Sequence, residues 1–248
     1  MSKSWEIISK STPIELTWEG DFQPDTPRTE AKILYLWKQA IRKGSEAYTN
    51  GAFLSMISAS VDSKKTAVRC IRAQYMYYFA QNREPAFNFH LRPVGVSGII
   101  EIQTPDGPAI VVAKRGKTVT QYPGLLEFIP SGGIDGDALL EGGRVDFMSQ
   151  FLREFAEETG ADPASATSIE PFAFIHDIQS DVYDVCALIR ADCAPDTIKL
   201  GVSKSGEYSD VVFVPSADIE SFIEKNKHIF VPTSPAIIKA MKETRILR

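Results

Sequence analysis

The chain has 248 residues, of which 44% are hydrophobic and 24% are charged, and its formal net charge is −5 at pH 7. This length is ample for a substantial core, and the composition is that of a soluble globular protein and excludes long disordered stretches. Because the acidic balance supplies no basic surface for a phosphate backbone, a nucleic-acid polymer is a poor candidate partner.

The cysteines and the N-terminus both point to a reducing compartment. Cys70, Cys186 and Cys193 are widely spaced and form no C-x-x-C pair, which argues against a disulfide framework and against a zinc site. The first residues hold no apolar core of signal-peptide length, and no stretch approaches the roughly 20 apolar residues of a membrane span. We expect a cytoplasmic protein without a membrane partner, and leave a homodimer open as an alternative to a monomer.

Residues 1–92 are expected to form an N-terminal extension or subdomain. Pro27, near a first helical turn, is followed by apolar residues at helical spacing, which predicts a helix that stops at Gly44. The apolar runs 52–60 and 66–72 flank a turn-forming Asp-Ser pair and predict a β-hairpin. The sequence has no flexible linker after this region, so it could equally extend the sheet that follows.

An aromatic-rich segment closes this N-terminal region. It spans residues 74–90 and contains Tyr75, Tyr77, Tyr78, Phe79, Phe87 and Phe89. Such rings either pack in the core of a helix and the loop after it, or stack against a nucleobase or sugar. Both interpretations stay open at this point.

From Pro93 onward the pattern changes to strands with interspersed helices. Alternation and turn residues predict strands at 94–102, 109–114, 125–129, 169–176, 182–190 and 211–215. Helical periodicity predicts helices at 145–159, 217–226 and 234–245. This order predicts an α+β fold with a mixed sheet, arranged as an α/β/α sandwich.

The helix predicted over 145–159 ends in a cluster of carboxylates. Glu154, Glu157 and Glu158 lie in its last turns, where the helix dipole disfavours anions. Like-charge pairs at i,i+3 and i,i+4 cost about 0.2–0.5 kcal/mol each on an exposed helix. A hard divalent cation such as Mg²⁺ prefers carboxylate oxygens and bridges to phosphate, so it would turn this unfavourable cluster into a binding site.

The same residues carry a resemblance to a known family. The string from Arg153 to Ala161 reads R-E-F-A-E-E-T-G-A, and it resembles the second half of the Nudix hydrolase box, R-E-apolar-x-E-E-x-G-apolar. An apolar strand with basic residues at 111–115 and the E-F-I-P-S-G-G run at 127–133 agree with it. The resemblance covers roughly residues 93–245, and it implies a Nudix hydrolase domain over 93–248 with the α/β/α sandwich of that superfamily.

The first half of the box departs from this pattern. The family places a glutamate eight residues before the arginine, and that position is Val145. Asp146, about 20° around the helix from Glu157 by the turn angle, is one candidate replacement, and Glu141 is another. The stretched box and the N-terminal extension resemble the UDP-glucose pyrophosphatase branch of the superfamily.

The resemblance implies a reaction and roles for the acidic residues. Water attacks a phosphorus of a nucleoside-diphosphate sugar, which releases a nucleoside monophosphate and a sugar 1-phosphate, with Mg²⁺ or alternatively Mn²⁺ as cofactor. Glu154 and Glu158 are expected to bind metal, with Glu157 as a third ligand or as the group that takes the water proton. The carbonyl of Gly133, or of its neighbouring glycine, is expected nearby, and Arg153 would orient a glutamate or complete an ion-pair network.

Other residues are candidates for catalysis and substrate binding. Glu207 lies in a segment expected to be a mobile loop, and is either the general base or a solvated carboxylate. Arg115 and Lys117 follow a core strand and would clamp phosphate unless they are ordinary surface cations. Tyr122 and Asp146 complete the predicted substrate-binding set.

Two rival functions remain on sequence alone. One is a Nudix pyrophosphatase acting on ADP-ribose, dinucleotides or nucleoside triphosphates. The other belongs to a different class: a Nudix-fold domain that binds a nucleotide or a partner protein without turnover. Val145, where a glutamate belongs, favours the binding domain, whereas the intact glutamates of the second half argue against it.

Overall fold

The structure, a computed structural model, describes residues 4–42, 49–84, 86–119 and 121–246. A mixed sheet of eleven strands runs through these residues, with β1, β9, β10, β5, β3, β4 and β2 hydrogen-bonded in that order. The strands are β1 Trp5–Lys10, β2 Ile14–Asp21, β3 Ala52–Val61, β4 Thr66–Gln74, β5 Pro93–Thr104, β6 Gly107–Arg115, β7 Leu126–Phe128, β8 Ser131–Gly133, β9 Ala166–Asp177, β10 Val182–Ala191 and β11 Tyr208–Pro215. The pairs β5 with β10 and β2 with β4 are parallel, and the other pairs are antiparallel.

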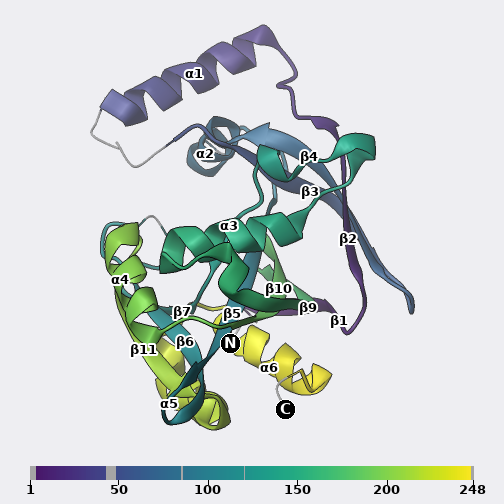
Figure 1. The fold of residues 1–248 in the computed structure, drawn as a ribbon. Coiled ribbons are helices and arrows are strands. Elements are labelled where there is room, and N and C mark those ends of the chain that lie inside the picture. The colour runs from purple at the N-terminus through teal and green to yellow at the C-terminus, as the bar shows by residue number, and fades with distance from the viewer. Residues whose placement is uncertain (1–3, 43–48, 85, 120, 247–248) are drawn as a thin grey trace.

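Helices cover both faces of the central strands. They are α1 Pro27–Arg42, α2 Tyr75–Arg83, α3 Phe147–Thr159, α4 Pro195–Ser205, α5 Ile219–Asn226 and α6 Ser234–Thr244. Figure 1 shows α3 crossing the middle of the molecule and α6 below the sheet. Helix α4 lies beside the C-terminal end of α3. In the described residues no helix combines the length and the apolar character needed to cross a membrane.

The two faces bury separate clusters of apolar side chains. On β10, Val185 and Ala187 pack into a cluster with Phe151 and Phe155 of α3, whereas the alternating Leu188 packs with α5 and α6 on the other side. Successive strand residues point to opposite faces, so one apolar strand serves both clusters. The expected α+β fold with a mixed sheet and helices on both faces is confirmed.

The N-terminal region joins this sheet directly. β1 pairs with β9 over the stretch from Trp5 to Lys10, and β3 pairs with β5 through Leu54 opposite Val94. The predicted hairpin is confirmed as β3 and β4, and the predicted helix begins at Pro27. Its expected stop at Gly44 lies outside the described residues. The division of the chain at residue 92 stays a prediction.

Several elements differ from the prediction. β1, β2, β8 and α4 were not expected, and α3 begins at Phe147, two residues later than predicted. The segment expected to be a mobile loop around Glu207 is mostly ordered structure, since α4 runs to Ser205 and β11 begins at Tyr208. Pro195 at the first turn of α4 and the alternation in β2 were the local signals for these elements.

The long connection between β8 and α3 packs against β2. The backbone N–H of Val145 donates to the Leu16 carbonyl at 3.1 Å, and Arg144 forms an isolated antiparallel bridge with Thr17. Gly143 has φ +77° and lies so close to the Trp18 carbonyl that a β-carbon there would be 2.8 Å from its oxygen. The inserted residues therefore join the N-terminal region to the start of α3.

Candidate active site

The acidic end of α3 is fixed by a cap at each terminus. The Asp146 carboxylate accepts the Ser149 N–H at 3.1 Å at the N-terminus, which satisfies a donor that has no partner within the helix. At the other end Gly160 takes the left-handed conformation, φ +65°, and its N–H donates to the Ala156 carbonyl. The glutamates therefore lie in the last turn and a half of a well-defined helix.

Glu158 is buried, although it lies on the polar face of α3. Its side chain is 1% exposed, and its Oε1 accepts the Ser131 N–H at 3.2 Å and the Tyr208 hydroxyl at 3.1 Å. Its Oε2 is buried and has no hydrogen-bond partner in the part of the chain that the structure describes. A buried carboxylate oxygen without a partner is costly unless a cation or a donor completes it.

Glu154, one turn earlier, packs directly against the backbone of β8. A β-carbon built on Gly132 would lie 2.1 Å from Glu154 Oε1, so this position accepts no side chain while the carboxylate is there. Gln150 donates to the same oxygen at 2.7 Å from the preceding turn. Glycine at 132 thus allows a carboxylate to lie against the strand.

A second pair of side chains lies behind these glutamates. Glu127, on β7, forms an ion pair with Arg115 at the end of β6, and both side chains are largely buried. The hydroxyl of Tyr208 lies 3.2 Å from Glu127 Oε2 as well as 3.1 Å from Glu158 Oε1. Tyr208 therefore connects the carboxylate of α3 to the carboxylate of β7.

Burial and mutual repulsion raise the pKa values of these groups. Burial raises the pKa of Glu158 well above its ordinary value, and the charges of Glu127 and Glu154 add to the effect. Burial raises the pKa of Glu154 to about 7, although the hydrogen bond from Gln150 acts in the opposite direction and lowers this pKa. Burial also raises the pKa of Glu127 even though its partner Arg115 opposes the shift. The cluster thus holds more negative charge than its neighbours neutralise.

Helix α4 sets the position of Glu207 relative to this cluster. Gly201 of α4 meets the C-terminus of α3 so closely that a β-carbon on it would lie 1.8 Å from the Thr159 carbonyl oxygen. Two residues beyond α4, the Glu207 carbonyl accepts the Gly116 N–H at 2.7 Å. The pKa of Glu207 is raised by partial burial and by the charge of Glu157, which indicates that the two carboxylates lie near each other.

A pocket with a volume of about 690 Å³ adjoins this cluster, within the range of about 300–1,000 Å³ that is usual for small-molecule sites. Glu127 and Glu207 line it directly, and the α3 glutamates lie behind its lining, where Glu158 contacts Ser131 and Glu154 contacts Gly132. Its lining combines the acidic residues with β8 and with an aromatic side contributed by the N-terminal region. The lining side chains include Phe53, Tyr75, Tyr78, Ser97, Arg115, Tyr122, Glu127, Asp177, Asp184 and Glu207. Burial raises the pKa of Asp184 to about 7, and the charges of Glu127 and Asp177 contribute.

The structure brings some of the predicted residues together and separates others. Gly133 lies on β8 and lines the pocket, and Tyr122 lines it with its hydroxyl donating to Asp177 Oδ2 at 2.7 Å. Lys117 is exposed and is not among the lining residues, and Arg115 is already paired with Glu127.

Three further predicted residues belong to α3 or to the connection before it. Arg153 forms ion pairs with Asp135 and with Asp137, the latter at 3.5 Å, both in the inserted connection. Asp146 caps the helix start, and at 1.5 Å of rise per residue it is about 16 Å along the axis from Glu157. The prediction compared only the angles around the helix axis and ignored this rise, so it placed Asp146 too close to Glu157. Glu141 is exposed within the inserted connection.

The residues around the pocket fit a hard cation by chemistry but do not form a closed cage. Among the described residues, no group of three or more His, Cys, Asp or Glu side chains is already arranged to hold a metal ion. The donor set nevertheless consists of carboxylates, which Mg²⁺ and Mn²⁺ prefer, and the buried Glu158 Oε2 lacks a partner.

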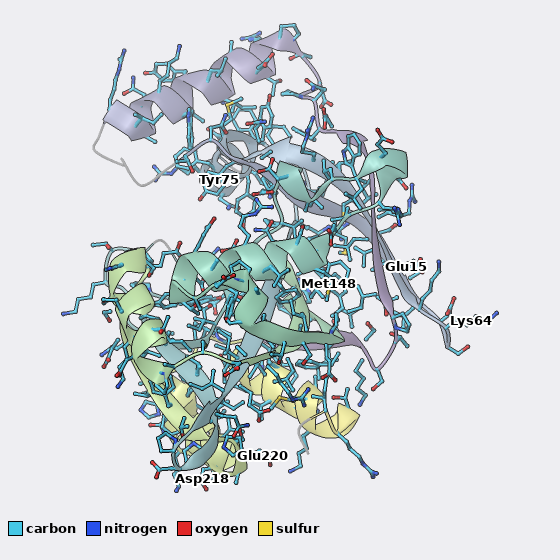
Figure 2. The ribbon with its side chains drawn as sticks, in the orientation of Figure 1. Glu15, Lys64, Tyr75, Met148, Asp218 and Glu220 are labelled. Carbon is cyan, nitrogen blue, oxygen red and sulfur yellow. The ribbon has the colours of Figure 1, made fainter. Side chains whose placement is uncertain are left out.

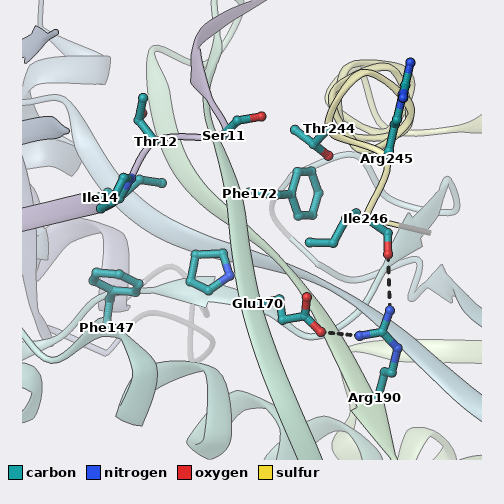
Figure 3. A pocket seen from close by; sticks show the side chains of 12 residues that line it. Ser11, Thr12, Ile14, Phe147, Glu170, Phe172, Arg190, Thr244, Arg245 and Ile246 are labelled. Carbon is teal, nitrogen blue, oxygen red and sulfur yellow. Dashed lines mark hydrogen bonds and ion pairs between the residues drawn. The ribbon is translucent and has the colours of Figure 1, made fainter. Parts of the chain in front are cut away.

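A second, larger cavity of about 870 Å³ lies elsewhere, between the β1–β2 turn and the C-terminal end of α6 (Figure 3). The half-buried Arg190 in its lining already has partners, because it pairs with Glu170 and with Glu101 and donates to the Ile246 carbonyl at 3.2 Å. Among its described lining residues Glu170 is the only carboxylate, whereas Glu127, Asp177, Asp184 and Glu207 all line the 690 Å³ pocket, which also adjoins the α3 glutamates through Ser131 and Gly132. The 690 Å³ pocket is therefore the better candidate, despite its smaller volume.

Sequence reasoning missed three residues of the site. Glu127 was recognised only within the E-F-I-P-S-G-G run that flanks the box, and no role was predicted for Tyr208 or Asp184. Glu127 and Asp184 are polar residues inside otherwise apolar strands, which is a signal that could have identified them. The bridging position of Tyr208 depends on tertiary packing and has no local signal.

Comparisons with known proteins give fold-level similarities of modest extent. No protein-family model and no curated protein matches the chain. Among solved structures, the Nudix domain of Shewanella oneidensis NrtR, in complex with ADP ribose, is 18% identical, with a TM-score of 0.43 over 68% of this chain and 96% of that one. DR0079 from Deinococcus radiodurans is 15% identical, with a TM-score of 0.43 over 60% of this chain and 83% of that one. A bifunctional NMN adenylyltransferase/ADP ribose pyrophosphatase from Francisella tularensis, in complex with AMP and a Mn ion, is 15% identical, with a TM-score of 0.43 over 68% of this chain and 45% of that one.

Proposed function

We propose that the protein is a divalent-metal-dependent hydrolase that cuts the pyrophosphate of a nucleoside-diphosphate sugar, with UDP-glucose as the model substrate. The observation that carries this proposal is the buried Glu158, whose Oε2 lacks a partner at the edge of a pocket lined with carboxylates. The R-E-F-A-E-E-T-G string that holds it is the part of the chain that resembles the Nudix box. A solvated acidic face would leave this oxygen in water.

The carboxylates define the end of the pocket where the diphosphate would bind. Glu154 and Glu158 would hold the cation, with Glu157 as the third carboxylate and a β8 carbonyl beside them. When bound, Mg²⁺ would neutralise phosphate charge and lower the pKa of a bound water. In the reaction a water oxygen bonds to phosphorus, the bridging P–O bond breaks, and the products are a nucleoside monophosphate, a sugar 1-phosphate and a proton.

Other residues of the chain would position the substrate and move the proton. Glu207 lines the pocket and has a raised pKa, so its carboxylate could accept the proton from the attacking water. Arg115 would contact a phosphate oxygen only by sharing its guanidinium with Glu127. Arg153 holds the inserted connection through Asp135 and so acts as a positioning residue for α3.

The charge of the pocket supports a sugar as the second half of the substrate. Among its described lining residues Arg115 is the only cation, and it is paired, whereas Asp177 and Asp184 add carboxylates. A triphosphate tail would carry extra negative charge into these surroundings, whereas sugar hydroxyls could donate hydrogen bonds to them. This arrangement favours a diphosphate joined to a neutral, hydroxyl-rich group over a nucleoside triphosphate.

The direct test is turnover with a matched pair of variants. Purified protein is incubated with Mg²⁺ and a panel of nucleoside-diphosphate sugars, ADP-ribose and nucleoside triphosphates, and the products are resolved by ion-exchange chromatography. Glu158→Gln keeps the shape of the side chain and should lower kcat/KM by at least about 100-fold, whereas Glu224→Gln on exposed α5 should leave it unchanged. Nucleotide binding without products in the wild-type protein would instead support a non-catalytic binding domain.

A further inference from the structure

The aromatic side of the pocket is built by the N-terminal region. It consists of Phe53 on β3 with Tyr75 and Tyr78 on α2, and we call these three residues the aromatic wall. All three line the same pocket as Glu127 and Glu207. Figure 2 labels Tyr75 at the level of α2, between α1 and α3. One cavity thus joins an uncharged aromatic surface to an acidic one.

Contacts behind the aromatic wall hold its rings in place. The Phe53 and Tyr78 rings pack edge to face with centroids 5.8 Å apart, and the Tyr75 and Tyr78 centroids are 6.1 Å apart. Tyr78 donates its hydroxyl to the Ser180 carbonyl at 3.2 Å, and Trp37 of α1 packs edge to face on Tyr75 at 6.1 Å. Rigid rings lose little entropy when a ligand stacks on them.

Burial separates Phe53 and Tyr75 from the core aromatics, whereas Tyr78, 8% exposed, belongs both to the pocket lining and to the apolar cluster. Tyr77 and Phe79 are 5% exposed and pack in the apolar cluster between α1 and α2, as the core interpretation expects. Tyr75 and Phe53 are only partly buried and face the pocket. The core interpretation therefore holds for Tyr77 and Phe79, whereas the position of Tyr75 in the pocket lining leaves it accessible to a stacked ligand.

The chemistry of a nucleotide sugar matches the two ends of the pocket. Its diphosphate is anionic and belongs with cations at the acidic end, and its nucleobase is its flat, uncharged part. Aromatic side chains stack on any base, since every base has a π-face. The sugar is surrounded by hydroxyls and suits the polar part of the lining, where Ser97 and Asp184 lie.

We infer that the aromatic wall is the nucleobase subsite, so that the N-terminal region supplies base stacking while the end of α3 supplies diphosphate hydrolysis. This inference rests on the proposed function for the identity of the ligand. Stacking of this kind accepts both purines and pyrimidines, and discrimination between bases would require hydrogen-bonding groups elsewhere in the pocket.

The test measures binding of the two product halves separately by calorimetry in Mg²⁺ buffer. The probes are uridine 5′-monophosphate, adenosine 5′-monophosphate and glucose 1-phosphate. Tyr75→Leu keeps an apolar side chain but removes the ring, and should weaken both nucleotides about fivefold or more while leaving glucose 1-phosphate unchanged. Tyr75→Phe keeps the ring and should bind nucleotides within about twofold of wild type.

Tyr35→Leu is the matched control, because Tyr35 is 61% exposed on α1 and lies outside the pocket. Phe53→Leu gives an independent removal of a ring, and thermal melting confirms that each variant is folded. Unchanged nucleotide affinity in both folded wall variants contradicts the inference, as does failure of both nucleotides to bind the wild type. Loss of glucose 1-phosphate binding instead would assign the wall to the sugar. Binding requires no turnover. A wild-type protein that binds nucleotides through Tyr75 but hydrolyses none of them would therefore contradict the proposed function and leave this inference intact.

Discussion

The two ends of α3 make different kinds of contact with the rest of the protein. The C-terminal end keeps three glutamates and buries one of them, Glu158, beside a pocket. At the N-terminal end the position that holds a glutamate in the family pattern is Val145, which is buried and hydrogen-bonded through its backbone to β2. One end thus carries a cluster of carboxylates beside a pocket, and the other joins the N-terminal region to the helix. The residue at 145 thus has a packing role in the structure, which accounts for its departure from the Nudix pattern that the neighbouring residues resemble.

Restoring the family glutamate is the sharpest test of that comparison. Val145→Glu would place a carboxylate where the side chain is 8% exposed, and should lower the free energy of unfolding by about 3 kcal/mol without raising hydrolysis. Chemical denaturation and turnover assays measure the two effects. Val212→Glu, at a 39% exposed valine of β11, should stay within about 0.5 kcal/mol of wild type. A stable Val145→Glu protein with faster turnover would show that both ends serve catalysis.

A glycine at the other end should be nearly as sensitive. Gly201→Ala places a methyl group against the Thr159 carbonyl, so α4 must move away from α3, at a cost of about 3 kcal/mol. The shift also displaces Glu207, and kcat should fall in whatever protein remains folded. Gly51→Ala, where an added β-carbon meets nothing within 4 Å, should be neutral or slightly stabilising. Wild-type melting of Gly201→Ala would contradict this contact.

The acidic end should also make metal-free stability depend on pH. Glu154 binds a proton more tightly when folded, with its pKa raised from about 4.5 to about 7, so the folded state holds more protons in that window. Stability should therefore fall as pH rises from 5 to 8, by about 2 kcal/mol, and millimolar Mg²⁺ should restore it at pH 8. Denaturation curves at several pH values with and without metal measure this. Stability that rises over the same range, or ignores Mg²⁺, would contradict a repulsive metal-binding cluster.

The smallest effect is expected at the helix start. Asp146→Ala removes the N-cap and should cost about 1 kcal/mol, while Asp146→Asn, which can still accept the Ser149 N–H, should recover most of it. Neither change should alter kcat/KM, since Asp146 is about 16 Å along the helix from Glu157. A large loss of kcat/KM in a fully stable Asp146→Asn protein would indicate that Asp146 contacts the substrate, as the sequence predicted.

The sequence predicted what depends on local pattern and missed what depends on packing. α3 and the β3–β4 hairpin were visible because apolar spacing and turn residues specify them locally. Glu158 belonged to the polar side of a helical wheel, and only contacts with Ser131 and Tyr208 show that it is buried. α4 was not predicted because Gly201, in its middle, has a low helix propensity. The close contact of this position with α3 requires a glycine there.

The pairing of β1 with β9 has a practical consequence for anyone who shortens the chain. β9 is a twelve-residue strand, and Phe172, Ala173, Phe174 and Ile175 within it are buried. Without the first ten residues its outer hydrogen-bonding groups would face water along a long apolar edge, the kind of edge that recruits strands from other molecules. Preparations that lack these residues are therefore expected to self-associate, and a loss of activity in them should be checked for aggregation before it is assigned to the active site.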